Sequence, residues 1–87
     1  MTQIEGRAYD SEKNIPIMNS RVIFKNNKTG ETFEVPTNEV GEFKIEIPEG
    51  TYTIHLLSQL YQPVTLKDVK IKGPAQEITF KSARIAL

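Results

Sequence analysis

Hydrophobic and polar residues alternate along most of this chain, and the alternation is clearest in its middle. Between residues 42 and 47, Phe and Ile alternate with Glu and Lys, which is typical of a strand with one buried and one exposed face. After Pro48-Glu49-Gly50 the alternation resumes over residues 51–56, where Tyr, Ile and Leu alternate with Thr and His. Two alternating runs on either side of a turn predict a β-hairpin.

The same alternation extends towards both ends of the chain. Clusters rich in Asn, Gly, Pro and Lys interrupt it, as at residues 26–30 and 72–74, and such clusters favour turns. We find no segment with apolar residues at helical spacing. Further strands are therefore predicted at residues 3–8, 21–25, 33–35, 65–71 and 78–80. The strand at 65–71 is inferred from two short alternating runs, residues 64–66 and 69–71.

Seven short strands separated by turns predict an all-β fold, a seven-stranded antiparallel sandwich of two facing sheets. The apolar residues that share one phase of the alternation should face the space between the sheets. We expect the following residues to be mostly buried: Val22, Phe24, Phe33, Phe43, Ile45, Tyr52, Ile54, Leu56, Val64, Ile78 and Phe80.

Two of the predicted strands have the character of sheet edges. Pro36 follows the strand near residues 32–35, and lysines line the strand at residues 65–71. Residues 1–81 are predicted to form the sandwich domain. Residues 82–87 continue the alternation and form a C-terminal tail, which we expect to add to the domain's own edge or to another subunit. A frayed end is the alternative.

Length and composition narrow the functional classes. The 87 residues suffice for one domain, and 11 Lys and Arg balance 11 Asp and Glu. A net charge of zero disfavours nucleic acid as a partner and gives no reason to expect an anionic membrane. The absence of Cys excludes disulfides, thiolate metal sites and a cysteine nucleophile. Neither a membrane-spanning apolar run nor a secretory signal after Met1 is recognisable, so the compartment stays open.

Four stretches of the sequence form a familiar combination: IEGRAYD, NSRVIFKNNKTGE, TNEVGEFKIEIPEGTYTI and LYQPVTLKDVKI. Together they resemble the carboxypeptidase regulatory-like domain, and the resemblance covers residues 4 to about 80. The most specific part is Gly41-Glu42-Phe43 followed by Pro48-Glu49-Gly50 and Thr-Tyr. The resemblance implies a transthyretin-like, Ig-like sandwich, related in architecture to the B-type repeats of collagen adhesins. It also implies a non-catalytic module without a shared active site, of a kind often secreted or found in the cell envelope.

His55 is the single histidine and falls on the outward phase of its predicted strand. A catalytic base needs a positioned partner, and no second His or Cys stands in the sequence, so we expect a surface or strand-edge histidine.

Asp10, Glu12 and Asn14 are spaced by two residues, like the opening of a calcium loop. The EF-hand pattern fails, because Ile15 and Arg21 stand where it requires Gly and Glu. A solvated turn is the preferred interpretation over a looser calcium site, and we predict no metal or cofactor requirement.

Other polar residues suggest weaker possibilities. An internal Lys–Asn amide of the adhesin type needs an inward lysine on the first strand. Arg7 is the basic residue there and cannot form this bond, so we do not expect the crosslink. The charged residues Glu42, Lys44, Glu46, Glu49 and Lys70 are expected to form cross-strand pairs on a wet face rather than a catalytic dyad.

Tyr9 and Tyr61 could lie at one end of the sandwich and stack on sugar rings. The sequence as a whole favours a non-catalytic structural or protein-interaction module, with a carbohydrate-binding module as the alternative. The expected partner is another protein or a copy of the chain itself, reached through an edge strand or the tail, and a glycan is the alternative partner.

Overall fold

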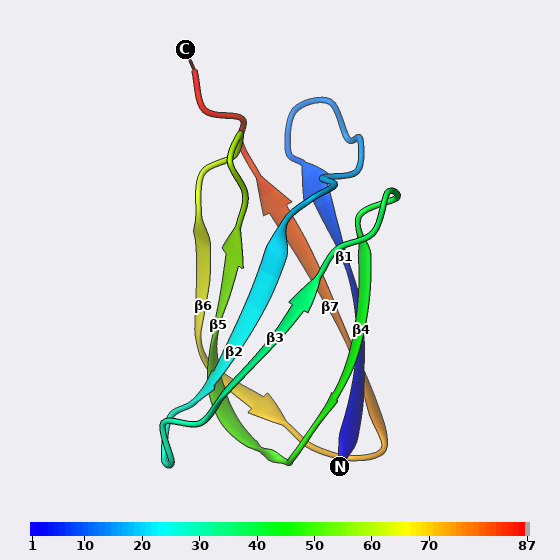
Figure 1. The fold of residues 1–87 in the computed structure, drawn as a ribbon. Helices are drawn as coiled ribbons and strands as arrows, with labels where there is room; N and C mark the ends of the chain where they lie inside the picture. The colour runs from blue at the N-terminus through cyan, green and yellow to red at the C-terminus, as the bar shows by residue number, and fades with distance from the viewer. Residues whose placement is uncertain (87) are drawn as a thin grey trace.

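Each of the seven predicted strands is present in the computed structural model, which describes residues 1–86. The alternating tail forms an isolated bridge at Arg84 rather than a further strand. The strands follow one another along the chain with turns between them (Figure 1). Their bounds are β1 Thr2–Asp10, β2 Arg21–Asn26, β3 Thr32–Pro36, β4 Glu42–Ile47, β5 Gly50–Leu57, β6 Val64–Ile71 and β7 Ala75–Ser82.

The seven strands form two facing sheets. The three-stranded sheet has the order β4-β1-β7, and the four-stranded sheet has the order β3-β2-β5-β6. The prediction of an all-β, seven-stranded sandwich is confirmed, and β3 and β6 lie at sheet edges as expected. Within the described residues no helix is long and apolar enough to cross a membrane.

One strand pair differs from the antiparallel pattern. β1 pairs with β4 in antiparallel register but with β7 in parallel register, from Gln3 beside Ala75 to Asp10 beside Ser82. The reason is directional: each turn reverses the chain, so odd-numbered strands run the same way. β1 and β7 are both odd and become neighbours, and their pairing is therefore parallel.

The predicted hairpin at Pro48-Glu49-Gly50 is wrong. β4 pairs with β1, whereas β5 pairs with β2 and β6, so the turn carries the chain from one sheet to the other. Alternation identifies the buried face of a strand and does not identify its partner. Both strands bury their apolar face in the same core, which is compatible with a hairpin and equally with a crossing between sheets.

The core lies between the sheets and contains four aromatic rings joined in a chain of contacts, in the order Phe80, Phe43, Phe24 and Tyr52. Phe43 packs against Phe24 and Phe80, with ring centroids 6.4 and 6.0 Å apart, and Phe24 meets Tyr52 edge to face. The buried apolar residues are Ile4, Ala8, Ile17, Val22, Phe24, Phe43, Ile47, Tyr52, Ile54, Leu56, Tyr61, Ile71, Ile78 and Phe80.

The predicted core is confirmed in most positions. Phe33, Ile45 and Val64 are only half-buried, because β3, β4 and β6 are edge strands with a neighbour on one side. Ile17 and Tyr61 are buried although they lie outside the strands, so the alternation did not reveal them.

Gly6 on β1 lies where the neighbouring strand and β7 leave no room for a side chain. It lies opposite Phe43 in the β1–β4 register, and the Phe43 ring covers it. A Cβ atom at this position would overlap both the Phe43 ring and the carbonyl oxygen of Ile78. A residue without a side chain is therefore required where β1 passes beneath the aromatic cluster.

Candidate interaction surfaces

Three loops lie together at the end of the sandwich that is uppermost in Figure 1. They are residues 11–20, 37–41 and 58–63, which we call the loop end. Large apolar side chains are exposed on all three loops: Ile15 is 46% exposed, Met18 52%, Val40 55% and Leu60 48%. Among the described residues, the remaining exposed large apolar side chain is that of Met1. The sandwich thus presents its exposed apolar side chains almost entirely at one end.

Asp10 organises the first loop from the last position of β1. Its side chain is buried, and its Oδ1 accepts hydrogen bonds from the backbone N–H groups of Glu12 and Lys13, each at 2.9 Å. These two bonds lower the pKa of the Asp10 carboxyl below its ordinary value, against the opposing effect of burial. The backbone N–H of Asn14 donates to the Asp10 carbonyl, so the chain turns tightly here.

The second half of the 11–20 loop is joined to the 37–41 loop and to β1. Ile17 is buried and its backbone N–H donates to the Ala8 carbonyl, while Ser20 and Thr37 are joined by a buried hydroxyl contact of 2.7 Å. Gly41 has φ of +75°, and a Cβ there would approach the Ala8 carbonyl oxygen to 2.7 Å. The apolar tips at Ile15, Met18 and Val40 are therefore carried by anchored loops.

The third loop is tied to the same carboxylate. The Tyr61 hydroxyl donates to Asp10 Oδ2 at 3.0 Å in a buried contact. Burial raises the pKa of Tyr61, and its hydrogen bond to Asp10 raises it further. Both oxygens of Asp10 are thus engaged, one in the 11–20 loop and one with the 58–63 loop.

The C-terminal tail lies against the same loop. The Gln62 N–H donates to the Ala83 carbonyl and the Ile85 N–H to the Leu60 carbonyl, each at 2.9 Å. Ser82 Oγ also donates to the Gln62 carbonyl. The described part of the tail therefore contacts its own domain, with Arg84 paired to Tyr61 in an isolated β-bridge. Leu87 lies outside the described residues.

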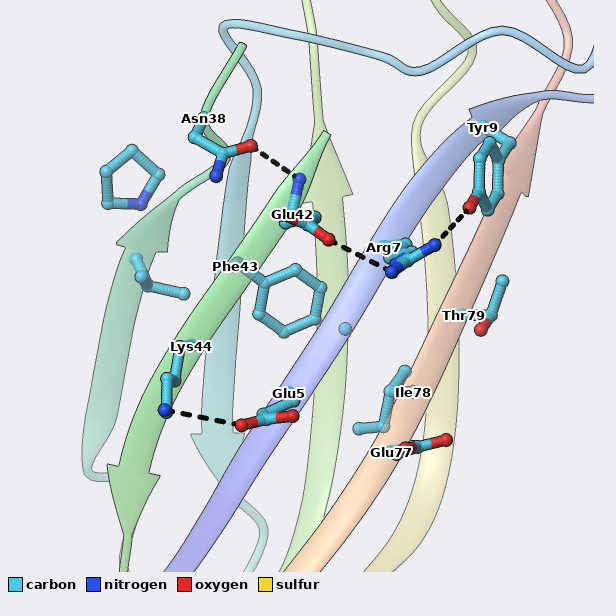
Figure 2. Close-up of a pocket in the computed structure, with 13 residues that line it drawn as sticks. Glu5, Arg7, Tyr9, Asn38, Glu42, Phe43, Lys44, Glu77, Ile78 and Thr79 are labelled. Carbon is cyan, nitrogen blue, oxygen red and sulfur yellow. Dashed lines mark hydrogen bonds and ion pairs between the residues drawn. The ribbon is translucent and has the colours of Figure 1, made fainter. Parts of the chain in front are cut away.

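A second surface is a polar groove of about 760 Å³ along β1, β4, β7 and the end of β3. Figure 2 shows the side chains in it joined in two chains of contacts. Arg7 pairs with Glu42 at 3.1 Å and donates to the Tyr9 hydroxyl at 3.2 Å. Lys44 pairs with Glu5 at 3.3 Å. The hydrogen bond to Tyr9 and the charge of Glu42 raise the pKa of Arg7 above its ordinary value.

The structure separates the residues that the sequence singled out. His55 faces outward from β5, and its Nδ1 lies 3.0 Å from Thr65 Oγ1 on β6, as expected for a strand histidine. Asp10 belongs to a hydrogen-bonded turn rather than a solvated one. Within residues 1–86 no group of three His, Cys, Asp or Glu side chains is arranged to hold a metal ion.

The idea of a two-tyrosine sugar platform is wrong in its geometry. Tyr61 is 7% exposed and its hydroxyl is bound to Asp10, so its ring has no free face for stacking. Tyr9 is half-buried at the groove. The predicted charge pairing on a wet face is confirmed for Glu42 and Lys44, which pair with β1.

Sequence reasoning missed the loop end. The spacing of Asp10, Glu12 and Asn14 suggests calcium, whereas Ile15, Ile17 and Met18 form an apolar cluster in the polar loop that follows β1. That apolar cluster is the feature of the sequence that could have indicated an exposed apolar loop. Alternation could not separate the buried Ile17 from its exposed neighbours, because loops have no fixed period.

Residues 3–82 match the family model of the carboxypeptidase regulatory-like domain. The chain belongs to this family. The family is a non-catalytic domain type, and the match covers β2 to β7 in full and β1 except for Thr2. A comparison with curated proteins found no relative.

Solved structures share the fold of this carboxypeptidase regulatory-like domain at low identity. A putative carbohydrate binding protein from Bacteroides uniformis is similar with a TM-score of 0.80 and 16% identity, over 93% of this chain and 40% of that one. A type II cohesin–X-dockerin complex from Acetivibrio cellulolyticus is similar with a TM-score of 0.65 and 17% identity, over 94% of this chain and 57% of that one.

A third similar structure is 3-chlorocatechol 1,2-dioxygenase from Rhodococcus opacus, with a TM-score of 0.72 and 12% identity, over 97% of this chain and 60% of that one. The chain therefore spans about 40 to 60% of the length of these proteins. At such identities the likeness establishes the sandwich fold alone.

Proposed function

We propose that this domain is a non-catalytic structural module that binds another protein through its loop end. The observation that carries the proposal is the gathering of Ile15, Met18, Val40 and Leu60 at one end of the sandwich. Apolar side chains exposed together are a feature of protein interaction sites. Anchored loops lose little conformational freedom on binding, which favours affinity.

Three further observations support this function. The family is of a non-catalytic type, and His55 and the groove carboxylates Glu5 and Glu42 are engaged with neighbouring side chains. The cohesin–dockerin complex is an assembly of proteins that contains a similar sandwich. A partner protein with an apolar patch is accordingly the occupant that fits the loop end.

Comparative affinity capture tests the proposal. The parent domain, a loop variant carrying Ile15→Ser, Met18→Ser, Val40→Ser and Leu60→Ser, and a control variant are immobilised in parallel. The control carries Lys28→Ser and Lys72→Ser, which are exposed at the opposite end. We expect a protein that the parent and control retain and the loop variant loses. Equal retention by all three, or no retained protein, contradicts the proposal.

Carbohydrate binding remains the second candidate. It is favoured by the groove beside Tyr9, where Arg7, Glu42 and Asn38 offer polar atoms, and by the likeness to a putative carbohydrate binding protein. A glycan array probed with the parent and with Tyr9→Ala tests it. Binding that depends on Tyr9 supports the candidate, and an array without signal removes it.

A further inference from the structure

The two sheets leave four edge strands, and three of them are poor templates for pairing. β6 is interrupted by a bulge opposite Tyr52 and Ile54, where Asp68 adopts φ of 56°. Lysines at 67 and 70 flank that bulge. Bulges and lysines are features that keep an edge from pairing with other chains.

β3 and β4 offer short edges. β3 has five residues and ends in Pro36, which lacks an N–H group. On β4, the N–H of Glu42 donates to Asn38 Oδ1 and its carbonyl accepts from the Asn38 N–H. The turn before β4 therefore already occupies one end of that edge.

β7 is different, because its eight residues contain neither a bulge nor a proline. Its parallel ladder with β1 is bounded by bonds from Gln3 N–H to the Pro74 carbonyl and from Ser11 N–H to the Ser82 carbonyl. Backbone groups alternate in direction along a strand, so the even-numbered residues of β7 face β1. The N–H and C=O groups of Glu77, Thr79 and Lys81 consequently point to the free edge.

We propose that two copies of this chain associate through β7, antiparallel and centred on Thr79. In that register Thr79 lies opposite Thr79 of the second copy, and Glu77 lies opposite Lys81 of the second copy. The two-fold axis repeats the Glu77–Lys81 pair, so both charges of each strand are matched. On the inner face, Ile78 lies opposite Phe80 of the second copy, which continues the cores of the two domains.

The charges select this register over its neighbours. Cross-strand partners must share a face of the sheet, so the nearest alternative registers are centred at Ile78 or Phe80. Either shift places Thr79 opposite Glu77 or Lys81 and removes both charge pairs. Opposite charges directly across an antiparallel pair are stabilising, and like charges are destabilising. The assembly is a continuous six-stranded sheet, and it uses a surface separate from the loop end.

Sedimentation equilibrium of the full chain, up to about 1 mM, tests the proposal over the range where weak association appears. We expect the mass to rise with concentration to twice that of one chain. Glu77→Lys or Lys81→Glu alone places like charges opposite each other and should weaken association about tenfold or more. The combined exchange Glu77→Lys with Lys81→Glu restores the pairing and should recover the dimer. Glu46→Lys on β4 is the matched control and should leave association unchanged.

Two further readouts locate the contact. Thr79→Pro removes an N–H that faces the free edge and should abolish the dimer, with circular dichroism used to check the fold. If that variant does not fold, the charge exchange decides by itself, since Glu77 and Lys81 are exposed. Amide exchange at Glu77, Thr79 and Lys81 should slow as the protein is concentrated. A mass that stays at one chain, or a dimer indifferent to these variants, overturns the proposal.

Discussion

At the scale of single residues, Asp10 connects two loops through one buried carboxylate. It is buried at the end of β1, and its two oxygens accept bonds from the 11–20 loop and from Tyr61. A buried carboxylate is tolerated only when its oxygens are satisfied in this way. Because the same group holds two loops, its ionisation couples the order of the loop end to pH.

The pKa shifts of Asp10 and Tyr61 predict that the free energy of unfolding depends on pH in both the acid and the alkaline range. The pKa of Asp10 is lowered from 3.8, so its stabilising effect is complete above that value and is lost as pH falls through the folded-state pKa. The pKa of Tyr61 is raised from 10.0, so its effect is complete below that value and is lost as pH rises through the folded-state pKa.

Urea unfolding across the pH range measures both limbs. We expect the free energy of unfolding to decline at acid pH less steeply in Asp10→Asn than in the parent, and at alkaline pH less steeply in Tyr61→Phe. Glu39→Gln, at an exposed position of the 37–41 loop, serves as the control and should follow the parent. Parallel curves for parent and Asp10→Asn would show that the carboxylate does not support the loops.

The contact between Gly6 and Phe43 gives a second prediction at this scale. Gly6→Ala places a methyl group against the Phe43 ring and the Ile78 carbonyl, and overpacking of this kind costs about 1–3 kcal/mol. In a Phe43→Leu background the ring is absent, so the added cost of Gly6→Ala should be smaller. Urea unfolding of the four proteins gives the coupling energy, and strictly additive effects would contradict the contact.

Alternation predicted the direction of most strand side chains, and its failures have physical causes. Asp10 continues the inward phase of Ile4 and Ala8, so its burial was readable in the pattern, but its spacing to Glu12 drew attention to calcium instead. Tyr61 lies outside the alternating runs, and only the folded chain brings it to Asp10.

At the scale of elements, the strands were predictable and their partners were not. Period-two alternation marks a strand by itself, whereas the choice between sheets depends on contacts distant in sequence. The chain changes sheet at Pro48-Glu49-Gly50, and β7 returns to lie beside β1. The groove could not be predicted for the same reason, since it combines side chains from β1, β4 and β7 with the end of β3.

The tail supplies the prediction that belongs to this scale. Ending the chain after Ser82 removes two backbone hydrogen bonds to the 58–63 loop and uncovers part of Tyr61. Each net hydrogen bond contributes about 0.5–1.5 kcal/mol, so we expect the free energy of unfolding to fall by roughly 1–3 kcal/mol. Thermal and urea unfolding check this, with Arg84→Ala as a control that keeps the backbone contacts. An unchanged stability would mean that the tail contributes nothing to the fold.

At the scale of the whole molecule, the buried core and the exposed apolar side chains lie in different parts of the sandwich. The core closes the space between the sheets, and the anchored loops present Ile15, Met18, Val40 and Leu60 at one end. The edge of β7 and the groove lie along the sides of the frame. The exposed apolar side chains of the loop end can therefore be changed without altering the β7 edge or the groove, which share Glu77 and Thr79.

The central claim, that the loop end binds a partner protein, is tested most directly by calorimetric titration of the captured partner. The parent, the fourfold loop variant and Glu77→Lys are titrated under the same conditions. We predict that the loop variant binds at least about tenfold more weakly than the parent and that Glu77→Lys, an exposed position on β7, binds as well as the parent, because β7 lies apart from the loop end. Equal binding by the parent and the loop variant would contradict the claim.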